Sequence, residues 1–307
     1  MADLNLWNIE VPDNNIRMPL ITVFTPTYNR AALLPRLYES LGRQTFADFE
    51  WIIVDDGSAD NTRDLVRQFT TAGFAIRYYY QENAGKHFAI NRGVNEAAGE
   101  LFFILDSDDM IPEEALATVA QKYDTLNDKL HIGGVAGRKA YFDGNLIGSG
   151  TGVDEEIMNV FDFRYKRKIA GDMCEVFKTS VLKEFPFPEI KGERFCPEAL
   201  VWNRIGTKYP LLWFNAPIYL AEYQPEGLTA RIFEVRKNSP VATTICYQEL
   251  SRAPISMAFR FRALINYWRF AFYLEKSFAE KLKAVHPILS LFALPIAGLM
   301  YLNDKRK

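Results

Sequence analysis

Between residues 19 and 112, short apolar runs alternate with amphipathic stretches, and this alternation constrains the fold more than any other feature. Runs of β-branched and aromatic residues predict strands at 20–24, 49–54, 74–80 and 101–105. Helical spacing of apolar residues predicts helices at 33–41, 61–69 and 87–98. Such alternation builds an α/β fold whose mostly parallel sheet carries helices on both faces. In these sheets ligands bind beyond the carboxyl ends of the strands.

Polar clusters follow the predicted strands, at residues 25–30, 55–58 and 81–86. The fourth strand ends on three carboxylates within four positions, Asp106, Asp108 and Asp109. Carboxylates at that density repel one another and resist burial, so we expect positive charge among them. A divalent cation that also holds phosphate oxygens is the natural candidate. The alternative is a solvated acidic turn that caps the next helix.

Beyond Pro112 the alternation loosens. Helical patterns recur at 115–126 and from Pro197 onward, and residues 133–145 suggest strand and hairpin structure. We therefore divide the chain into an N-terminal extension (1–18), a central domain (19–235) and a helical C-terminal region (236–307). The central domain has two halves, 19–112 and 113–235.

The composition argues against several classes of protein. A net charge of −2 argues against a nucleic-acid binder, which would be expected to carry a basic surface. The three cysteines are widely spaced, which is typical of core thiols in a reducing compartment. The first residues are acidic and lack an apolar stretch, so no secretion signal is expected and the chemistry should face the cytoplasm. The three histidines show neither metal-ligand spacing nor a nucleophile partner.

Four short motifs occur in a characteristic order: Thr25-Pro-Thr-Tyr-Asn-Arg30, Val54-Asp-Asp-Gly-Ser58, Asn83-Ala-Gly-Lys86 followed by Asn91, and Leu105-Asp-Ser-Asp-Asp109. Over roughly residues 19–230, this order and spacing resemble the family 2 nucleotide-diphospho-sugar glycosyltransferases, which have the GT-A fold. The resemblance implies a Rossmann-like sheet and a nucleotide-sugar donor, with UDP-sugars favoured. It also implies Mn²⁺ or Mg²⁺ as cofactor and an oligosaccharide or lipid-linked acceptor, as in the bacterial synthesis of capsule and exopolysaccharide.

The same resemblance assigns eight residues to the nucleotide-sugar site: Thr25, Pro26, Tyr28, Asn29, Asp56, Lys86, Asn91 and Asp106. Asp56 is expected to accept a hydrogen bond from the base, Tyr28 to stack on the base, and Lys86 to offset diphosphate charge. Simple turns and a surface lysine are the alternatives for these residues. Asp108 is implied as the main metal ligand, with Asp109 as an alternate ligand.

An inverting transfer also needs a base that accepts the proton of the acceptor hydroxyl. Members of this family carry a Glu-Asp pair at the start of a helix, followed by an aromatic residue and an arginine. Here Glu198 keeps the first acid, but Ala199 replaces the second, which is often the base. Glu198 is our first candidate and Glu193 the second, while compensation of a helix dipole is the alternative role of Glu198. Trp202 is expected either to line the acceptor pocket or to pack in the core.

The C-terminal region combines aromatic, basic and apolar stretches. Residues 259–276 are rich in aromatic residues and arginine, and residues 287–302 are almost uncharged and contain Pro295. Sixteen residues fall short of the ~20 that a transmembrane helix needs. An interfacial anchor built on a hairpin-like apolar segment is predicted, which would place the protein on the inner face of the cell membrane. A core-packing helix is the alternative.

Two other functions stay open at this stage. A nucleotidyltransferase that builds sugar nucleotides would share the fold, but it would be expected to carry a Gly-rich, arginine-containing loop after the first strand. The sequence shows no such loop at this position. A non-catalytic scaffold subunit of a polysaccharide assembly complex is compatible with the replacement at Ala199.

Overall fold

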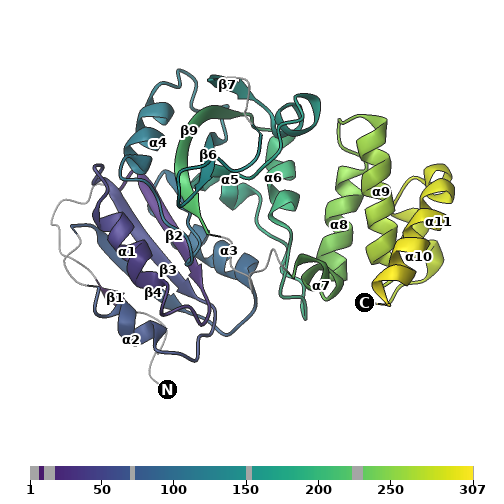
Figure 1. The fold of residues 1–307 in the computed structure, drawn as a ribbon, viewed down its shortest axis with the longest axis horizontal. Helices are drawn as coiled ribbons and strands as arrows, with labels where there is room; N and C mark the ends of the chain where they lie inside the picture. The colour runs from purple at the N-terminus through teal and green to yellow at the C-terminus, as the bar shows by residue number, and fades with distance from the viewer. Residues whose placement is uncertain (1–6, 10–17, 70–72, 150–153, 223–230, 307) are drawn as a thin grey trace.

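The structure is a computed structural model that describes residues 7–9, 18–69, 73–149, 154–222 and 231–306 (Figure 1). The strands are β1 (Trp7–Ile9), β2 (Ile21–Thr27), β3 (Phe49–Asp55), β4 (Ala75–Tyr80), β5 (Leu101–Ile104), β6 (Gly134–Tyr141), β7 (Glu155–Met158), β8 (Met173–Lys178) and β9 (Leu211–Ala221). The helices are α1 (Leu34–Gly42), α2 (Thr62–Val66), α3 (Lys86–Glu96), α4 (Ala115–Asp124), the π-helix η1 (Asp162–Lys166), α5 (Thr179–Glu184), α6 (Glu198–Gly206), α7 (Ile232–Lys237), α8 (Pro240–Leu250), α9 (Met257–Ala271), α10 (Phe278–Lys283) and α11 (Pro287–Asp304).

All strands of the described residues belong to one sheet, in the order β1-β4-β3-β2-β5-β8-β6-β9-β7. The four strands predicted from the alternation, β4, β3, β2 and β5, pair in parallel. The second half of the sheet is mixed, because β8 runs antiparallel to both β5 and β6. Since β2 has β3 on one side and β5 on the other, the connections that follow β2 and β5 leave the sheet at neighbouring points. Such a point is where open α/β sheets bind ligands.

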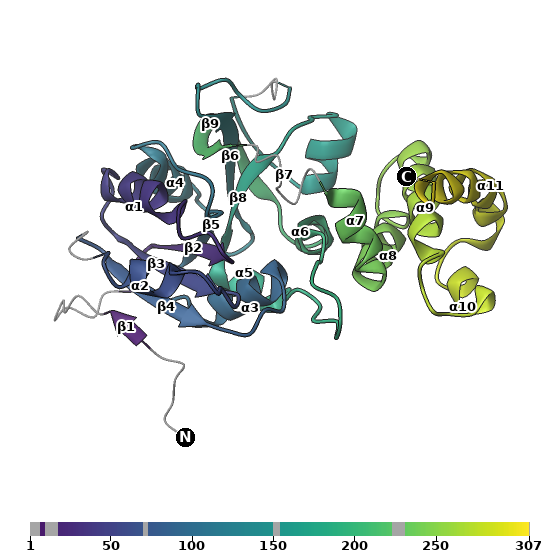
Figure 2. The ribbon, with the colours of Figure 1, turned by 60° about the horizontal axis from the view of Figure 1, so that its bottom comes forward.

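Two buried clusters cover the two faces of the sheet. Side chains of β2 alternate between them, so Val23 lies in the same cluster as Leu34 and Leu37 of α1, whereas Phe24 lies in the cluster of α3 and α6. Helices α1, α2 and α4 contribute to the first cluster, and α3, α5, α6 and α8 to the second. Figure 2 shows α1 and α4 on one side of the sheet, with α3 and α5 on the other. This confirms the predicted mostly parallel sheet with helices on both faces.

The strand β2 and the helix α2 end at other residues than the sequence predicts. β2 runs on to Thr27, past the predicted end at Phe24, because the Asp56 N–H donates to the Thr27 carbonyl at 2.8 Å and extends the contact with β3. α2 is shorter than predicted and ends before Phe69, which is still buried. The cysteines are buried and free, as expected for core thiols: Cys174, Cys196 and Cys246.

The helices α9, α10 and α11, hereafter the C-terminal helical unit, enclose a separate small core. In Figure 1 they lie at the end of the molecule remote from α1. The prediction of a hairpin-like apolar segment is wrong, because Pro287–Asp304 forms one continuous helix with Pro295 inside it. Ser290, Ala293 and Ala297 recur on one face of α11 and are buried along it, so close packing extends over most of the helix. Helix α8 contacts both cores, because Ala242 and Cys246 lie in the sheet-side cluster whereas Tyr247 packs against the cluster of the C-terminal helical unit.

Candidate functional site

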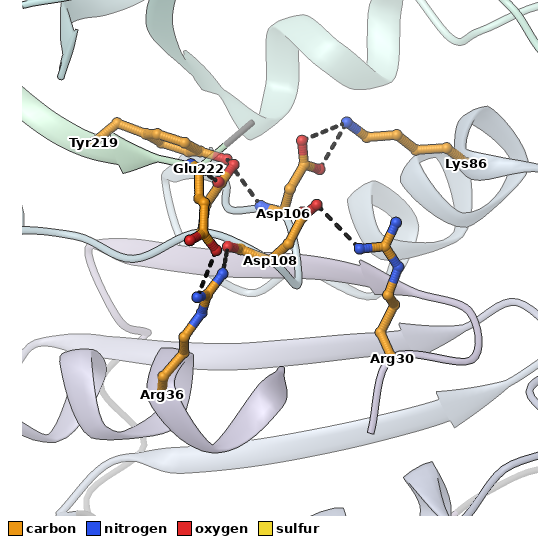
Figure 3. A network of polar contacts seen from close by, with 8 residues as sticks. Arg30, Arg36, Lys86, Asp106, Asp108, Tyr219 and Glu222 are labelled. Carbon is orange, nitrogen blue, oxygen red and sulfur yellow. Dashed lines mark hydrogen bonds and ion pairs between the residues drawn. The ribbon is translucent and has the colours of Figure 1, made fainter. Parts of the chain in front are cut away.

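A cluster of charged side chains lies at the carboxyl ends of β2 and β5 (Figure 3). Its centre is Lys86, the first residue of α3, whose Nζ lies 2.7 Å from Asp106 Oδ1 and 2.8 Å from Glu198 Oε1. Asp106 follows β5, and Glu198 begins α6. One lysine therefore joins the acidic cluster after the parallel strands to the first candidate base in the other half of the domain. We call Arg30, Lys86, Asp106, Asp108 and Glu198 the strand-end cluster.

Opposite charges decide the ionisation of this cluster. Burial alone would lower the pKa of Lys86, but the charges of Asp106 and Glu198 outweigh it and raise the pKa above its usual value. Burial raises the pKa of Asp106, yet Lys86 and the neighbouring Lys139 hold it below the usual value. Lys86 and Asp106 are therefore a charged pair at neutral pH.

Asp108 is bound by two arginines from the segment that follows β2. Its Oδ2 lies 3.1 Å from Arg30 Nη1, and its backbone carbonyl accepts a hydrogen bond from Arg36. The side chain is 21% exposed, and among the described residues Arg30 is the one that pairs with this carboxylate. Asp108 therefore keeps an accessible oxygen for a further ligand.

The positive charge that we expected among the three carboxylates is supplied in the structure by lysine and arginine side chains. Lys86 pairs with Asp106 and Arg30 with Asp108, and the three carboxylates point to different partners. Within the described residues no three His, Cys, Asp or Glu side chains gather as a metal cage. Mn²⁺ and Mg²⁺ in donor sites need few protein ligands, because substrate phosphates supply the rest. Asp108, a carboxylate with an accessible oxygen, fits that kind of site.

Asp109 is built into the end of β9. The Tyr219 hydroxyl donates to its Oδ2 at 2.6 Å, and the Glu222 N–H donates to its Oδ1 at 3.0 Å. Burial, followed by the charge of Asp106, raises the pKa of Asp109 to about 6. The Tyr219 hydroxyl also accepts the Asp106 N–H at 3.1 Å, so one tyrosine fixes both ends of the acidic turn. Asp109 thus anchors β9 here, and its use as an alternate metal ligand stays a prediction.

Asp56 orders the loop that leads to Lys86. Its carboxylate is buried and accepts the backbone N–H groups of Ala84, at 3.0 Å, and Gly85, at 2.8 Å. It also accepts the side-chain amides of Gln81 and Asn83. Gly85 has φ of +111° and packs against the Arg194 backbone, so only a glycine fits before Lys86. The contact of Asp56 with a base stays a prediction. Such a contact would add to the hydrogen bonds that the carboxylate already accepts, or replace one of them.

The motif after β2 is divided between the core and the surface. Asn29, at φ of +52°, accepts the Ala59 N–H and donates its own N–H to Ser58 Oγ, which ties together the loops after β2 and β3. Tyr28 is 48% exposed at the same edge, which leaves its ring accessible. Thr25 is fully buried and accepts a hydrogen bond from Trp51, and Pro26 is buried within β2. Of these assignments, Tyr28 and Asn29 lie at the site, and the Thr25 side chain lies in the core.

Three other assigned residues lie in structural contacts. Asn91 bonds to the backbone of Phe187, and both Glu193 oxygens accept the N–H groups that begin α8, at 2.6 and 2.8 Å. Trp202 packs against Phe177 and Phe187, with ring centroids 4.6 and 5.6 Å apart, in the core position that was the alternative. Glu193 is therefore committed to capping a helix, whereas Glu198 remains 38% exposed in the cluster.

Sequence reasoning left five residues of this neighbourhood unassigned: Arg30, Arg36, Lys139, Tyr219 and Glu222. Arg30 stands inside a recognised motif, so its position was a usable signal. Arg36 pairs with Glu222 at 2.7 Å, and Lys139 lies 4.1 Å from the ring centroid of Tyr219. No local pattern marks Tyr219 or Glu222, because β9 brings them here through a pairing with β6 far along the chain.

The model of a protein family described as glycosyl transferase family 2 matches residues 22–184. This range holds the four parallel strands and most of the strand-end cluster, including Arg30, Lys86, Asp106 and Asp108. Glu198 lies beyond the matched range.

Two curated relatives are similar to the chain over about three fifths to two thirds of its length. A GalNAc(5)-diNAcBac-PP-undecaprenol beta-1,3-glucosyltransferase of Campylobacter jejuni is 32% identical over 189 residues, which are 60% of this chain and 59% of the relative. Glycosyltransferase GlyG of Streptococcus pneumoniae is 30% identical over 213 residues, 66% of this chain and 70% of the relative. The alignment with the C. jejuni protein thus leaves about two fifths of that relative unmatched.

Two solved structures share the fold over nearly the whole chain. TarS 1-349 of S. aureus, in complex with UDP-GlcNAc, has a TM-score of 0.64 at 18% identity and covers 92% of this chain and 89% of the other. The mannosyltransferase PcManGT of Pyrobaculum calidifontis, with GDP-Man and Mn²⁺, has a TM-score of 0.55 at 19% identity, with coverage of 94% and 89%. At these identities the likeness establishes the GT-A-like architecture.

Proposed function

Because the chain belongs to glycosyl transferase family 2, we propose that it transfers a sugar from a nucleotide diphosphate donor to a glycan acceptor. The observation that carries this proposal is the bridge from Asp106 through Lys86 to Glu198. It joins a cation suited to phosphate with a partly exposed carboxylate suited to an acceptor hydroxyl. The bridge stands at the sheet edge where α/β folds bind ligands.

The donor we propose is a UDP-sugar. Tyr28 offers an exposed ring to the base, and Lys86 offers a point charge to the diphosphate. The S. aureus structure with the same fold contains UDP-GlcNAc, which supports the choice of a uracil base. Asp106, held by Lys86, is positioned to contact the ribose or to orient the residues around it.

We propose Mn²⁺ or Mg²⁺ as the cofactor, with Asp108 as the protein ligand. The P. calidifontis structure with the same fold contains Mn²⁺ beside its nucleotide sugar, and this supports the proposal. When bound, the ion would stabilise the negative charge that develops on the leaving nucleotide. Arg30, 3.1 Å from Asp108, holds the carboxylate in place from the loop after β2.

We assign the role of base in an inverting transfer to Glu198. Glu198 is the first residue of α6, and its side chain is 38% exposed, so an acceptor hydroxyl can reach the carboxylate. Direct attack of that hydroxyl on the sugar carbon, on the side opposite the nucleotide, inverts the configuration. Glu198 accepts the hydroxyl proton, and the bond to the nucleotide diphosphate breaks.

The acceptor we propose is a lipid-linked saccharide in surface polysaccharide synthesis. The name of the C. jejuni relative describes an undecaprenol-linked acceptor, and that similarity supports the choice. A lipid-linked acceptor lies at a membrane, so the enzyme would meet it on the cytoplasmic face, where nucleotide sugars are available.

Thermal-shift screening of nucleotide sugars with and without Mn²⁺, followed by a donor-hydrolysis assay, tests the proposal. We expect one UDP-sugar to raise the melting temperature only with the metal, and to be slowly hydrolysed. Retained binding without hydrolysis or transfer would favour the scaffold function that Ala199 suggests. Formation of a sugar nucleotide from a sugar phosphate and a nucleoside triphosphate would favour the nucleotidyltransferase.

A further inference from the structure

Helix α11 exposes a continuous apolar face. Six large apolar side chains of this helix are 43–72% exposed: Ile288, Leu291, Phe292, Ile296, Leu299 and Leu302. Their spacing of three and four residues places them on one side of the helix. Among the described residues α11 is the one helix long and apolar enough to cross a membrane, and 17% of its residues are buried.

The opposite face of α11 is fixed to α9. The Trp268 indole N–H donates to Ser290 Oγ at 2.9 Å, and Arg269 binds Asp304 through two bonds of 2.6 Å. Ala293 and Ala297 are fully buried between these two contacts. To span a bilayer, α11 would have to leave this packing. The ion pair between Arg269 of α9 and Asp304 of α11 would then either enter the membrane or break. The geometry therefore favours a helix that stays on α9 and presents one side outward.

Charge is concentrated in the same part of the chain. Residues 252–306 contain nine Lys and Arg but three Asp and Glu, whereas the whole chain contains 36 basic and 38 acidic residues. Exposed basic side chains flank the apolar face at both ends of the helix, on Lys283 before it and on Lys305 and Arg306 after it. This excess disfavours a second copy of the same face, which would bring like charges together, and favours an anionic surface.

We propose that α11 lies flat on an anionic lipid surface, with its apolar face in the interface and the flanking Lys and Arg at the phosphate level. An 18-residue helix is about 27 Å long, so this contact extends along one side of the C-terminal helical unit. The proposal concerns the partner of this surface and does not depend on which sugar the enzyme transfers.

Sedimentation with vesicles tests this proposal on the full-length chain. We expect binding to vesicles of equal phosphatidylglycerol and phosphatidylcholine, at least tenfold weaker binding to pure phosphatidylcholine, and weakening by high salt. The double variant Leu291→Asp, Leu299→Asp should bind anionic vesicles at least tenfold more weakly, since both side chains are already exposed and the fold does not need them. The matched control is Leu130→Asp, which changes a leucine that is 80% exposed outside the helix.

A second variant reports on the bound geometry without removing the apolar face. In Phe292→Trp, the fluorescence of the introduced indole should be quenched more strongly by lipids brominated near the headgroup than by lipids brominated at the bilayer centre. Stronger quenching from the centre would overturn the flat orientation. Absence of vesicle binding by the unchanged protein, or equal binding by the double variant, would overturn the lipid partner. Self-association that the double variant abolishes, without vesicle binding, would replace the lipid with a second copy.

Donor binding separates this inference from the proposed function. The double variant should bind the UDP-sugar with Mn²⁺ as the unchanged protein does, because α11 contributes no residue to the strand-end cluster. An intact vesicle contact in a protein that binds no donor would leave the lipid inference standing and remove the proposed function.

Discussion

At the carboxyl ends of β2 and β5 the protein partly buries charged side chains, whereas on α11 it leaves large apolar side chains in water. Both choices cost free energy, because charges lose hydration at the first place and apolar surface remains hydrated at the second. At the strand ends, protein cations offset the cost: Lys86 pairs with Asp106 and Glu198, and Arg30 with Asp108. On α11, the described residues supply nothing that covers the apolar face.

The difference indicates which kind of ligand each region can bind. In the strand-end cluster the diphosphate of a donor would compete with Asp106 and Glu198 for Lys86, whereas Asp108 keeps an accessible oxygen for a metal. The α11 face has no contacts to exchange, so a lipid surface would add contacts without breaking any. Residues of the first region should therefore affect chemistry, and residues of the second should affect location or local stability.

The largest expected effect is that of Asp108→Ala. Loss of the proposed metal ligand should lower transfer by at least about 10³-fold and abolish Mn²⁺-dependent donor binding. Calorimetry with the donor nucleotide, with and without Mn²⁺, measures the binding. The fold should persist, because Asp108 is partly exposed and its backbone contact with Arg36 does not need the side chain. Unchanged metal-dependent binding would contradict the assignment.

Substitution of each candidate base in turn should distinguish an effect on turnover from an effect on stability. Glu198→Gln keeps the side-chain shape but cannot accept the proton, so turnover should fall by on the order of 10²-fold with similar donor affinity. Glu193→Gln should weaken the cap of α8 and cost about 1–2 kcal/mol of stability, with turnover changed only slightly. Steady-state kinetics and thermal unfolding of both variants measure this. An active Glu198→Gln beside an inactive Glu193→Gln would reverse the ranking.

Lys86→Gln should have a smaller effect on transfer, about tenfold, mainly through weaker donor binding. The variant removes the point charge proposed for the diphosphate, but it also releases Glu198 from its ion pair, and the second change offsets part of the first. Titration with the nucleotide diphosphate measures the affinity. Lys183→Gln, at an exposed lysine away from the cluster, is the matched control. Equal donor affinity in both variants would show that Lys86 serves the fold alone.

The smallest expected effect belongs to the C-terminal helical unit. Ser290→Ala leaves the buried Trp268 N–H without its acceptor, which should cost about 1 kcal/mol or somewhat more of stability. Donor binding should be unchanged, because no described contact joins Ser290 to the strand-end cluster. Thermal unfolding and donor titration of the same preparation measure both quantities. A loss of donor affinity would show that the two regions are energetically coupled.

Much of the parallel half was predictable, because its contacts come from short-range patterns. The runs around Val23, Ile52 and Phe102 are rich in apolar residues and largely buried, and each is followed by polar residues that had to meet at one edge. The pairing of β2 with β3 and β5 then brings Arg30 and Asp108 together. Such a meeting follows from topology and needs no side-chain detail.

The roles of Glu193, Thr25 and Tyr219 were not predictable from local sequence. Glu193 caps α8, which begins at Pro240, nearly fifty residues later in the chain. Thr25 faces Trp51 and not the site because of its place in the alternation of β2. Tyr219 reaches the acidic turn only because β9 pairs with β6. Each contact joins distant segments, so no window of the sequence contains both partners.

The sequence by itself determined the parallel strands, the edge at which polar residues collect and the apolar character of the C-terminal region, because periodicity and composition are local properties. Tertiary structure decided which acid remains available at the site, which cations stand among the carboxylates, and which face of α11 stays exposed. Those outcomes depend on partners far along the chain: α8 occupies Glu193, Lys86 meets Glu198, and α9 covers Ala293 and Ala297 while Leu299 remains outside.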